Sequence, residues 1–413
     1  MESIVTDLDR ALSSEQILKS IVEGLPQEII AGVQRTLTTE RNELKNLLKA
    51  YQDAKTGDFT ALKEQTGNDP GAFLIAARIM RGFSQKELAR KLGLREQAIQ
   101  RWETERYRSI SLANYLKVAR TLGVRLRLDD ISVIGDAWDA PYDVPKEEMT
   151  KVLRHARDKG WFEIGEASDE NASSTLIRYV GDHVIRYGTP SLLRTGLNIV
   201  NHTGDWSLLS WKAQITRQAE DKINKFHPIY RVINVSWLMD LVRLSRLENG
   251  PKLARDFLLD HGIVLITEPQ IPGMTIDGAA FLIEDVPVIG MTLRRDTIDN
   301  FWFTLLHEVA HIVLHYRTGL SSGFFDDTDS PGIDEFEEEA NQFASNILLP
   351  EQIWARSTAR IAKTPEPIEK LANQIGIHPA IIFGRIQMER NDYKIFTNRI
   401  GRGTVRKQLF ETA

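Results

Sequence analysis

Cysteine is absent from the 413-residue chain. Its absence excludes disulfide bonds, thiolate catalysis and every cysteine-based zinc site, so any metal site has to be built from histidine, aspartate and glutamate. No apolar run approaches the roughly 20 residues that a membrane-spanning helix needs. The first residues also lack the basic stretch and apolar core of a secretory signal. We therefore expect a cytoplasmic protein with no membrane partner.

The charge of the chain is spread unevenly. Residues 71–128 hold 13 lysines and arginines but four acids, whereas residues 326–339 hold eight acids and no base. A basic module inside a chain of net charge −5 indicates that one part of the protein meets a polyanion. A solvated charged face is the alternative, and charge alone does not separate the two.

Hydrophobic residues make up 42% and charged residues 26% of the chain, which is typical of globular proteins. At roughly 100–200 residues per domain, this length predicts two to four domains. Helical spacing of apolar residues dominates, and strand-like runs occur at 262–266, 279–283 and 286–293. We predict an α+β protein that is mostly helical and has one small sheet.

A long apolar helix is predicted over 299–316, and it carries an arrangement typical of zinc hydrolases. His307 and His311 lie four positions apart, so both imidazoles leave the same face and can bind one ion. Glu308 is offset by one position and can accept a proton from a bound water without coordinating the metal. The structural alternative is a pair of hydrogen-bonded core histidines beside a surface glutamate.

A catalytic zinc (Zn2+) site needs three protein ligands, and the predicted helix 334–348 supplies acids for the third. Glu337 shares a helical face with two alanines that would let it approach another helix closely. It is therefore the preferred third ligand, with Glu339 as the alternative. Asn341 is placed to hydrogen-bond a ligand histidine. His315 is expected to be structural or a substrate contact rather than a ligand.

Such a site predicts amide hydrolysis. Zinc held there would lower the pKa of a water and polarise a carbonyl, and Glu308 would take the proton of that water as it attacks. We expect the strand 286–293, which precedes the metal helix, to pair with an extended peptide substrate by β-addition.

Residues 72–123 show a second pattern, that of two short helices joined by a tight turn. Ser84 and Glu87 have capping-box spacing, and Gly93 permits the turn. On the second helix, arginines that suit guanine or phosphate and glutamines that suit adenine face outward; they are Arg95, Gln97, Gln100 and Arg101. Gln85 is placed to contact phosphate. A helical interaction module with a basic solvated face is the alternative.

Several motifs in the last part of the chain occur in one order that resembles the ImmA/IrrE metallopeptidases. They are Gly262-Ile263-Val264, Asp277-Gly278-Ala279-Ala280, Pro287-Val288-Ile289-Gly290, Asp299 to Glu308 and Glu337 to Ala344. The resemblance covers roughly 235–390 and implies a zincin-like fold, with His307, His311 and Glu337 on zinc and Glu308 as base. It also implies cleavage of a repressor or partner protein at few sites. Asn341 stands where related gluzincins often carry aspartate.

The residues from Arg78 through Ser84, Gly93 and Trp102 to Glu103 resemble the XRE/Cro-type DNA-binding family. The resemblance implies that Arg78 pairs with Glu103 and that a recognition helix lies near 95–104. The chain departs from the family at Arg95 and Glu96, where serine or threonine is usual, so the sequence preference on DNA is not readable. The order of the two modules is similar to peptidase-fused HigA-type antitoxin regulators.

We therefore predict a regulator that binds double-stranded operator DNA, fused to a zinc-dependent endopeptidase, in a toxin-antitoxin, prophage or defence module. Its protein partner would be a substrate or a cognate toxin, and a homodimer is allowed for. The alternative is a non-catalytic antitoxin or autorepressor in which the zinc site is structural. The expected domains are a helical extension (1–68), the helix-turn-helix domain (69–130), a linker and helical middle region (131–245) and the metallopeptidase domain (246–413).

Overall fold

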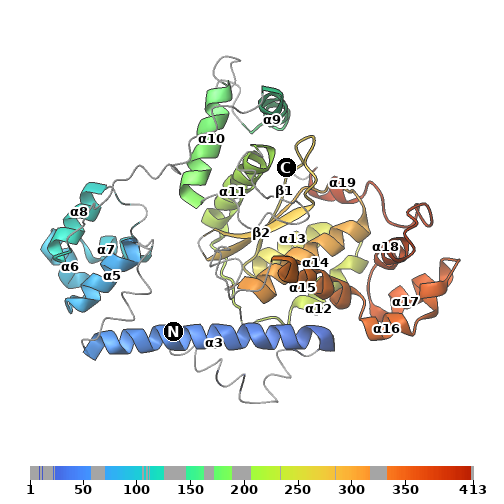
Figure 1. The fold of residues 1–413 in the computed structure, drawn as a ribbon, viewed down its shortest axis with the longest axis horizontal. Helices are drawn as coiled ribbons and strands as arrows, with labels where there is room; N and C mark the ends of the chain where they lie inside the picture. Colours follow the sequence, from blue (N-terminus) through green and yellow to red (C-terminus); the bar gives the residue numbers. More distant parts are fainter. Residues whose placement is uncertain are drawn as a thin grey trace. The chain divides into compact units, whose positions relative to one another are not determined.

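The chain divides into two compact units, of which the first comprises 1–10 and 39–137 and the second 11–38 and 138–413. The structure is a computed structural model, shown in Figure 1. It describes residues 9, 12, 22, 24–56, 70–104, 107, 110, 112–124, 146–161, 172–187, 206–232, 234–283, 285–316 and 333–410. Most of the expected linker at the start of 131–245 lies outside the described residues, as does the acidic stretch before residue 333.

Short helices make up the first unit. They follow in sequence the last part of α3 (Gln27–Thr56) and are α5 (Pro70–Met80), α6 (Gln85–Leu92), α7 (Glu96–Thr104) and α8 (Leu112–Thr121). Ser84 and Glu87 form the predicted capping box at the start of α6, and Gly93 ends this helix with a φ of 71°, which glycine adopts without strain. The helices α5 to α8 share a hydrophobic core, which includes Leu74, Leu88, Ile99, Trp102, Val118 and Leu122.

Among its described residues, the second unit combines helices with three strands. The helices are α9 (Lys146–Asp158), α10 (Ala172–Tyr187), α11 (Trp206–Phe226), α12 (Leu238–Arg243), α13 (Gly250–Asp260), α14 (Ile298–His315), α15 (Ile333–Leu348), α16 (Glu351–Ala355), α17 (Glu366–Ile375), α18 (Pro379–Glu389) and α19 (Val405–Leu409), with 3-10 turns η1 (Leu244–Arg246) and η3 (Thr358–Ile361). The strands are β1 (Val264–Thr267), β2 (Gly278–Ile283) and β3 (Val286–Met291). The prediction of a mostly helical α+β protein with one small sheet is confirmed.

The three strands form one mixed sheet in the order β1-β3-β2. β3 runs parallel to β1, with Val264 opposite Val288, and antiparallel to β2, with Ala280 opposite Ile289. The central position of β3 shows that the expectation for strand 286–293 was wrong, because both of its edges are already paired and cannot accept a peptide strand. Strand order depends on contacts far apart in sequence, which the hydrophobic pattern does not encode.

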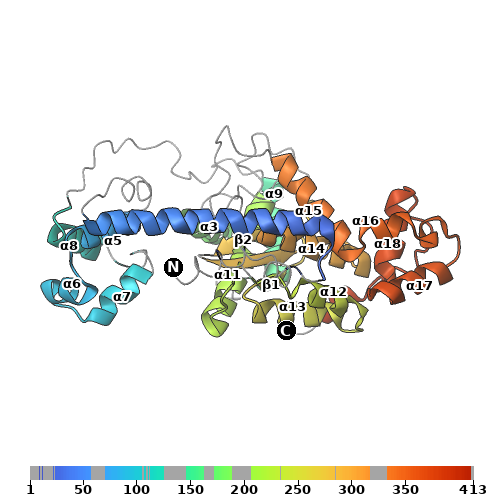
Figure 2. The same cartoon turned by 90° about the horizontal axis from the view of Figure 1, so that it is seen from below.

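Helices cover both faces of the sheet (Figures 1 and 2). α11 packs on one face, where a Cβ at Gly290 would lie 3.0 Å from the Trp211 ring. α14 packs on the other face, where a Cβ at Gly278 would lie 2.8 Å from the Glu308 carboxylate. Glycine at these two positions therefore lets a helix approach a strand closely on each side.

Helices α9, α10 and α11 share one hydrophobic core with the strands. Val152, Leu176 and Trp211 are buried in the same cluster as Val264 and Phe281. A polar contact joins the same elements, since the Glu268 carboxylate after β1 accepts hydrogen bonds from Trp161 Nε1 at 3.0 Å and Gln218 Nε2 at 2.6 Å. The helices of the predicted middle region thus stabilise the sheet that supports α14.

The first part of α3, up to Thr38, belongs to the second unit and packs against the end of α14. Val33 and Leu37 are each 1% exposed, and burial of such side chains contributes roughly 1.5–3 kcal/mol apiece. A Cβ at Gly32 would lie 2.9 Å from the Leu314 side chain, and Thr36 Oγ1 donates to the Leu314 carbonyl at 3.1 Å. This close packing fixes the start of α3 on the helix that carries the histidines. Among the described helices, none is both long and apolar enough to cross a membrane.

Candidate metal centre

Two histidines of α14 point their Nε2 atoms at one another. α14 is buried over most of its surface, with Phe301, Trp302 and Leu305 among its inaccessible side chains. Because His307 and His311 are one turn apart, their imidazoles leave the same face of the helix. Their Nε2 atoms lie 3.1 Å apart, and each residue is 8% exposed.

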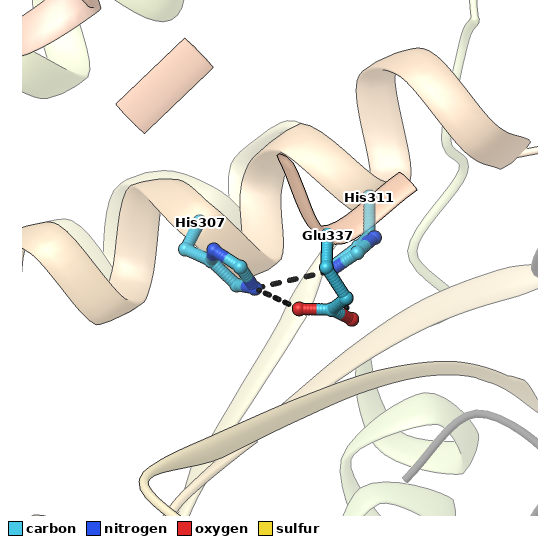
Figure 3. A group of neighbouring side chains, drawn as sticks. All are labelled: His307, His311 and Glu337. Carbon is cyan, nitrogen blue, oxygen red and sulfur yellow. Dashed lines mark hydrogen bonds and ion pairs between the residues drawn. The ribbon is translucent and has the colours of Figure 1, made fainter. Parts of the chain in front are cut away.

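Glu337 joins the two histidines from α15, which packs alongside α14. Its carboxylate oxygens lie 3.3 Å from His307 Nε2 and 3.4 Å from His311 Nε2. Figure 3 shows the three side chains converging, with both histidines on one helix. Their donor atoms all lie within 4.8 Å of one another, so this group could hold a metal ion. The structure therefore brings the predicted ligands together.

The spacing of these donor atoms fits a small divalent cation. In a tetrahedral zinc site with bonds of about 2.0–2.1 Å, neighbouring donor atoms lie about 3.3 Å apart. The observed separations of 3.1, 3.3 and 3.4 Å match this value. Two imidazoles and a carboxylate are also the kind of donor set that zinc accepts. The residues present fit the metal that the sequence motif implies.

The electrostatics of the group depend on the mutual pairing of the three side chains. Burial alone would raise the pKa of Glu337, but its polar contacts with the His307 and His311 rings outweigh it and lower the pKa to about 2. Burial would likewise lower the pKa of His307, yet its contact with Glu337 and the charge of Glu308 raise the pKa above its ordinary value. The site therefore holds a carboxylate that stays ionised and attracts positive charge.

Each histidine has a second partner at its other ring nitrogen. His307 Nδ1 lies 3.0 Å from Asn341 Oδ1, which places Asn341 in the contact expected from the sequence. Because a carbonyl oxygen only accepts, this contact assigns the proton to Nδ1 and leaves the Nε2 lone pair free for a metal. His311 Nδ1 lies 3.1 Å from His315 Nδ1.

The alternative ligand, Glu339, lies with a different partner. Its carboxylate contacts His315 Nε2 at 3.1 Å and Arg35 Nη2 at 2.7 Å. Glu339 does not belong to the group of donor atoms formed by His307, His311 and Glu337. The geometry therefore favours Glu337 over Glu339 as the third donor.

Glu308 is buried between α14 and the edge of the sheet. It is 2% exposed, and the Ala280 backbone amide of β2 favours its ionised form. Burial raises the pKa of Glu308 above its ordinary value, although the neighbouring histidines oppose this shift. Glu308 lies outside the metal-binding group but lines the same cavity, as a base that acts on a bound water must.

A cavity of about 440 Å³ opens in front of these side chains. Gly278 of β2 lines one wall, whereas Phe303 of α14 and Ile381 of α18 supply apolar surface. His307, Glu308 and Glu337 all contribute to the lining. The candidate catalytic groups thus face a space that can receive part of a peptide.

The first unit contains the predicted helix-turn-helix. Arg78 donates to both carboxylate oxygens of Glu103, at 2.5 and 2.8 Å, so the pairing implied by the family resemblance is present. Gln85 Nε2 also donates to Glu103 at 2.8 Å. The Gln85 side chain is therefore already engaged within the fold. Its expected phosphate contact remains a prediction, and the donor would have to be the second hydrogen of Nε2 or the backbone N–H groups at the start of α6.

The remaining predicted DNA contacts lie on or just before α7. The side chains of all four are exposed, while Ile99 and Trp102 on the opposite face are buried. These exposed residues are Arg95, Gln97, Gln100 and Arg101. The helix thus presents a polar, basic face to its surroundings, as a recognition helix does.

The contacts of His315 with Glu339 and of Glu339 with Arg35 were missed from the sequence. Arg35 lies 304 positions before Glu339, and no local pattern links the two. His315 did carry a signal, since it continues the four-residue spacing of the ligand histidines.

Comparisons with protein-family models identify both modules. Residues 74–128 match the helix-turn-helix family, and residues 259–382 match the IrrE N-terminal-like domain of M78 metallopeptidases. No curated protein and no solved structure matches the chain. The protein therefore joins an XRE-type helix-turn-helix domain, which implies DNA binding, to a metallopeptidase-like domain that contains the group His307, His311 and Glu337.

Proposed function

We propose that the protein is a cytoplasmic DNA-binding regulator whose second unit is a zinc-dependent endopeptidase. The observation that carries this proposal is the convergence of His307, His311 and Glu337 on one point, with the buried Glu308 beside them. The donor separations fit zinc, and the cavity gives a substrate access to the same side chains. We further propose that it cleaves one partner protein in a toxin-antitoxin, prophage or defence module.

The proposed chemistry is hydrolysis of a peptide bond. Zinc bound by the three side chains would lower the pKa of a water molecule and polarise the scissile carbonyl. Glu308 takes a proton from the attacking water and returns it to the departing amine nitrogen, so the products are a carboxylic acid and an amine. The close packing of β2 at Gly278 holds the Glu308 carboxylate in place for both transfers.

The edge strand β2, rather than the central β3, is our candidate for substrate pairing. β2 borders the cavity at its first residue, Gly278, next to the preceding Asp277, and lies at the end of the sheet order. An extended peptide that adds to this edge would gain main-chain hydrogen bonds and would pass in front of Glu308. The apolar residues Leu348, Ile381 and Met388 then offer a wall for one of its side chains.

The first unit would place the protein on double-stranded DNA. We propose that Arg95, Gln97, Gln100 and Arg101 enter the major groove and that Gln85 lies near the backbone. Replacing an arginine that neutralises a phosphate with alanine should reduce the slope of the logarithm of the binding constant against the logarithm of the salt concentration by about one. Lys363→Ala, an exposed position in the second unit, is the matched control. Protection of two half-sites one helical turn apart would indicate the homodimer that we propose.

The decisive experiment compares the wild type with Glu308→Gln. Both proteins are expressed in cells that lack the native gene, and new protein N-termini are identified across the proteome by mass spectrometry. The proposal predicts a small set of N-termini that require Glu308, while zinc content and DNA binding stay unchanged. Identical sets of N-termini in the two strains would refute the peptidase and support the alternative, a non-catalytic antitoxin or repressor with a structural zinc.

A further inference from the structure

We infer that Arg35, Glu339 and His315 are positioning residues that hold the ligand His311 from behind, so that the N-terminal helix α3 completes the metal centre. The inference rests on the metal site of the proposed function and deepens it. It assigns a role to three residues that neither ligate nor act as the base.

The chain of contacts is continuous. Arg35 Nη2 donates to one oxygen of Glu339 at 2.7 Å. The other oxygen of Glu339 lies 3.1 Å from His315 Nε2, and His315 Nδ1 lies 3.1 Å from His311 Nδ1. His311 Nε2 faces the shared point of the metal-binding group. Four side chains from α3, α15 and α14 thus form one line that ends at the proposed ion.

Only one arrangement of protons satisfies every link with neutral imidazoles. A carboxylate accepts, so His315 carries its proton on Nε2 and donates it to Glu339. His315 Nδ1 is then an acceptor, and His311 must donate from Nδ1. This leaves the lone pair of His311 on Nε2, the atom that faces the metal-binding group. The chain therefore selects the tautomer of His311 that can bind a metal and fixes the orientation of its ring.

The burial of the links predicts how much each contributes. The side chain of His315 is 3% exposed, whereas those of Glu339 and Arg35 are 41% and 65% exposed. A buried contact has no water to replace it, while an exposed ion pair is screened and adds little. The loss of zinc affinity on replacement should therefore be largest for His315, smaller for Glu339 and smallest for Arg35.

The packing of α3 gives Arg35 a fixed place despite its exposure. The neighbouring Val33 and Leu37 are buried, and Thr36 is hydrogen-bonded to the Leu314 carbonyl at the end of α14. The packing of α3 on α14 therefore places the Arg35 guanidinium next to Glu339. No ligand or base is contributed by α3, so its role at the site is one of positioning.

The test is the affinity of the full-length protein for zinc, measured by competition with a chromophoric chelator after complete removal of metal. Replacing residues behind a metal ligand typically costs 10–100-fold in affinity, and His315→Leu should fall in this range. Glu339→Ala should weaken zinc binding by about tenfold. Arg35→Ala should weaken it about two- to fivefold, as expected for an exposed ion pair.

Two further variants separate positioning from general stability. Glu338→Ala removes an exposed acid next to Glu339 that contacts Gln342 instead, and it should leave zinc affinity unchanged. His315→Gln offers both an acceptor oxygen and a donor nitrogen, so it should restore part of the affinity that His315→Leu loses. The visible spectrum of the cobalt-substituted protein should shift in His315→Leu and Glu339→Ala but not in Glu338→Ala.

Zinc affinities of Glu339→Ala and Arg35→Ala equal to that of Glu338→Ala would overturn the inference, even if His315→Leu fails to fold. A wild type that binds no zinc would overturn both the inference and the metal site on which it rests. A wild type that binds zinc tightly but releases no new N-termini would refute the proposed peptidase alone. The two proposals can thus fail separately.

Discussion

Gly278 lies where β2 passes closest to the proposed base, and its replacement by alanine should impair cleavage without removing the metal. A Cβ at this position would lie 2.8 Å from Glu308 Oε1 and 3.0 Å from Thr304 Cγ2. Ordinary contacts of this kind begin near 3.4 Å, so the Glu308 carboxylate has to move by about half an ångström.

The size of the effect follows from the displacement. A catalytic group misplaced by 1 Å can cost roughly 100-fold in rate, so half of this displacement should cost about tenfold in kcat/KM, or about 1.4 kcal/mol. Zinc affinity should stay within twofold of the wild type, because Glu308 is not one of the converging donors. The assay is the rate of appearance of the N-termini that require Glu308, together with zinc content.

Gly290→Ala is the matched control for this prediction. It places the same methyl group on the opposite face of the sheet, 3.0 Å from Trp211 and 3.2 Å from Ile215. Overpacking there should lower the free energy of unfolding by about 1–3 kcal/mol but leave the cleavage rate per folded molecule unchanged. Equal rate losses in the two variants, or full activity in Gly278→Ala, would refute the placement of the base.

Three further predictions concern the ligand set, the first unit and a buried lysine. Glu337→Gln should weaken zinc binding by roughly 100–1,000-fold, since structural zinc sites gain about 3 kcal/mol per ligand, whereas Glu338→Gln should not change it; equal affinities would contradict the assignment. Glu103→Ala leaves a charged arginine without its partner, and unfolding of the first unit should become easier by about 3–5 kcal/mol with zinc affinity unchanged. Burial lowers the pKa of Lys212 to about 8, so the folded protein should gain stability as pH rises from about 8 towards 10.5. Lys212→Met should lack this rise and be more stable at pH 7 by about 2 kcal/mol in urea unfolding, and a parallel pH dependence of the two proteins would contradict the shift.

Residues near one another in sequence made much of the site predictable. His307 and His311 share a face because the helical repeat places them there, and Glu337 could be preferred over Glu339 because it lies on the face with small residues. The capping box at Ser84 and the turn at Gly93 are equally local, and both are present in the structure.

Features that depend on distant segments were not predictable. The sheet order places β3 in the centre, so the strand expected to bind substrate is closed on both edges. The contact of Arg35 with Glu339 spans most of the chain, and no periodicity indicates it. The sequence predicted a phosphate contact for Gln85, because its partner Glu103 is brought to it only by the packing of α6 against α7. In each case tertiary packing decides which polar groups meet.

Zinc-edge X-ray absorption on the purified, dialysed protein tests the centre of this account most directly. We expect one zinc per chain, with scattering from two imidazoles and from oxygen ligands at about 2.0–2.1 Å. The imidazole signal and the bound zinc should both disappear in the double variant His307→Ala, His311→Ala. Zinc that is absent after dialysis, or a spectrum that is the same in this variant, would contradict the proposed metal centre.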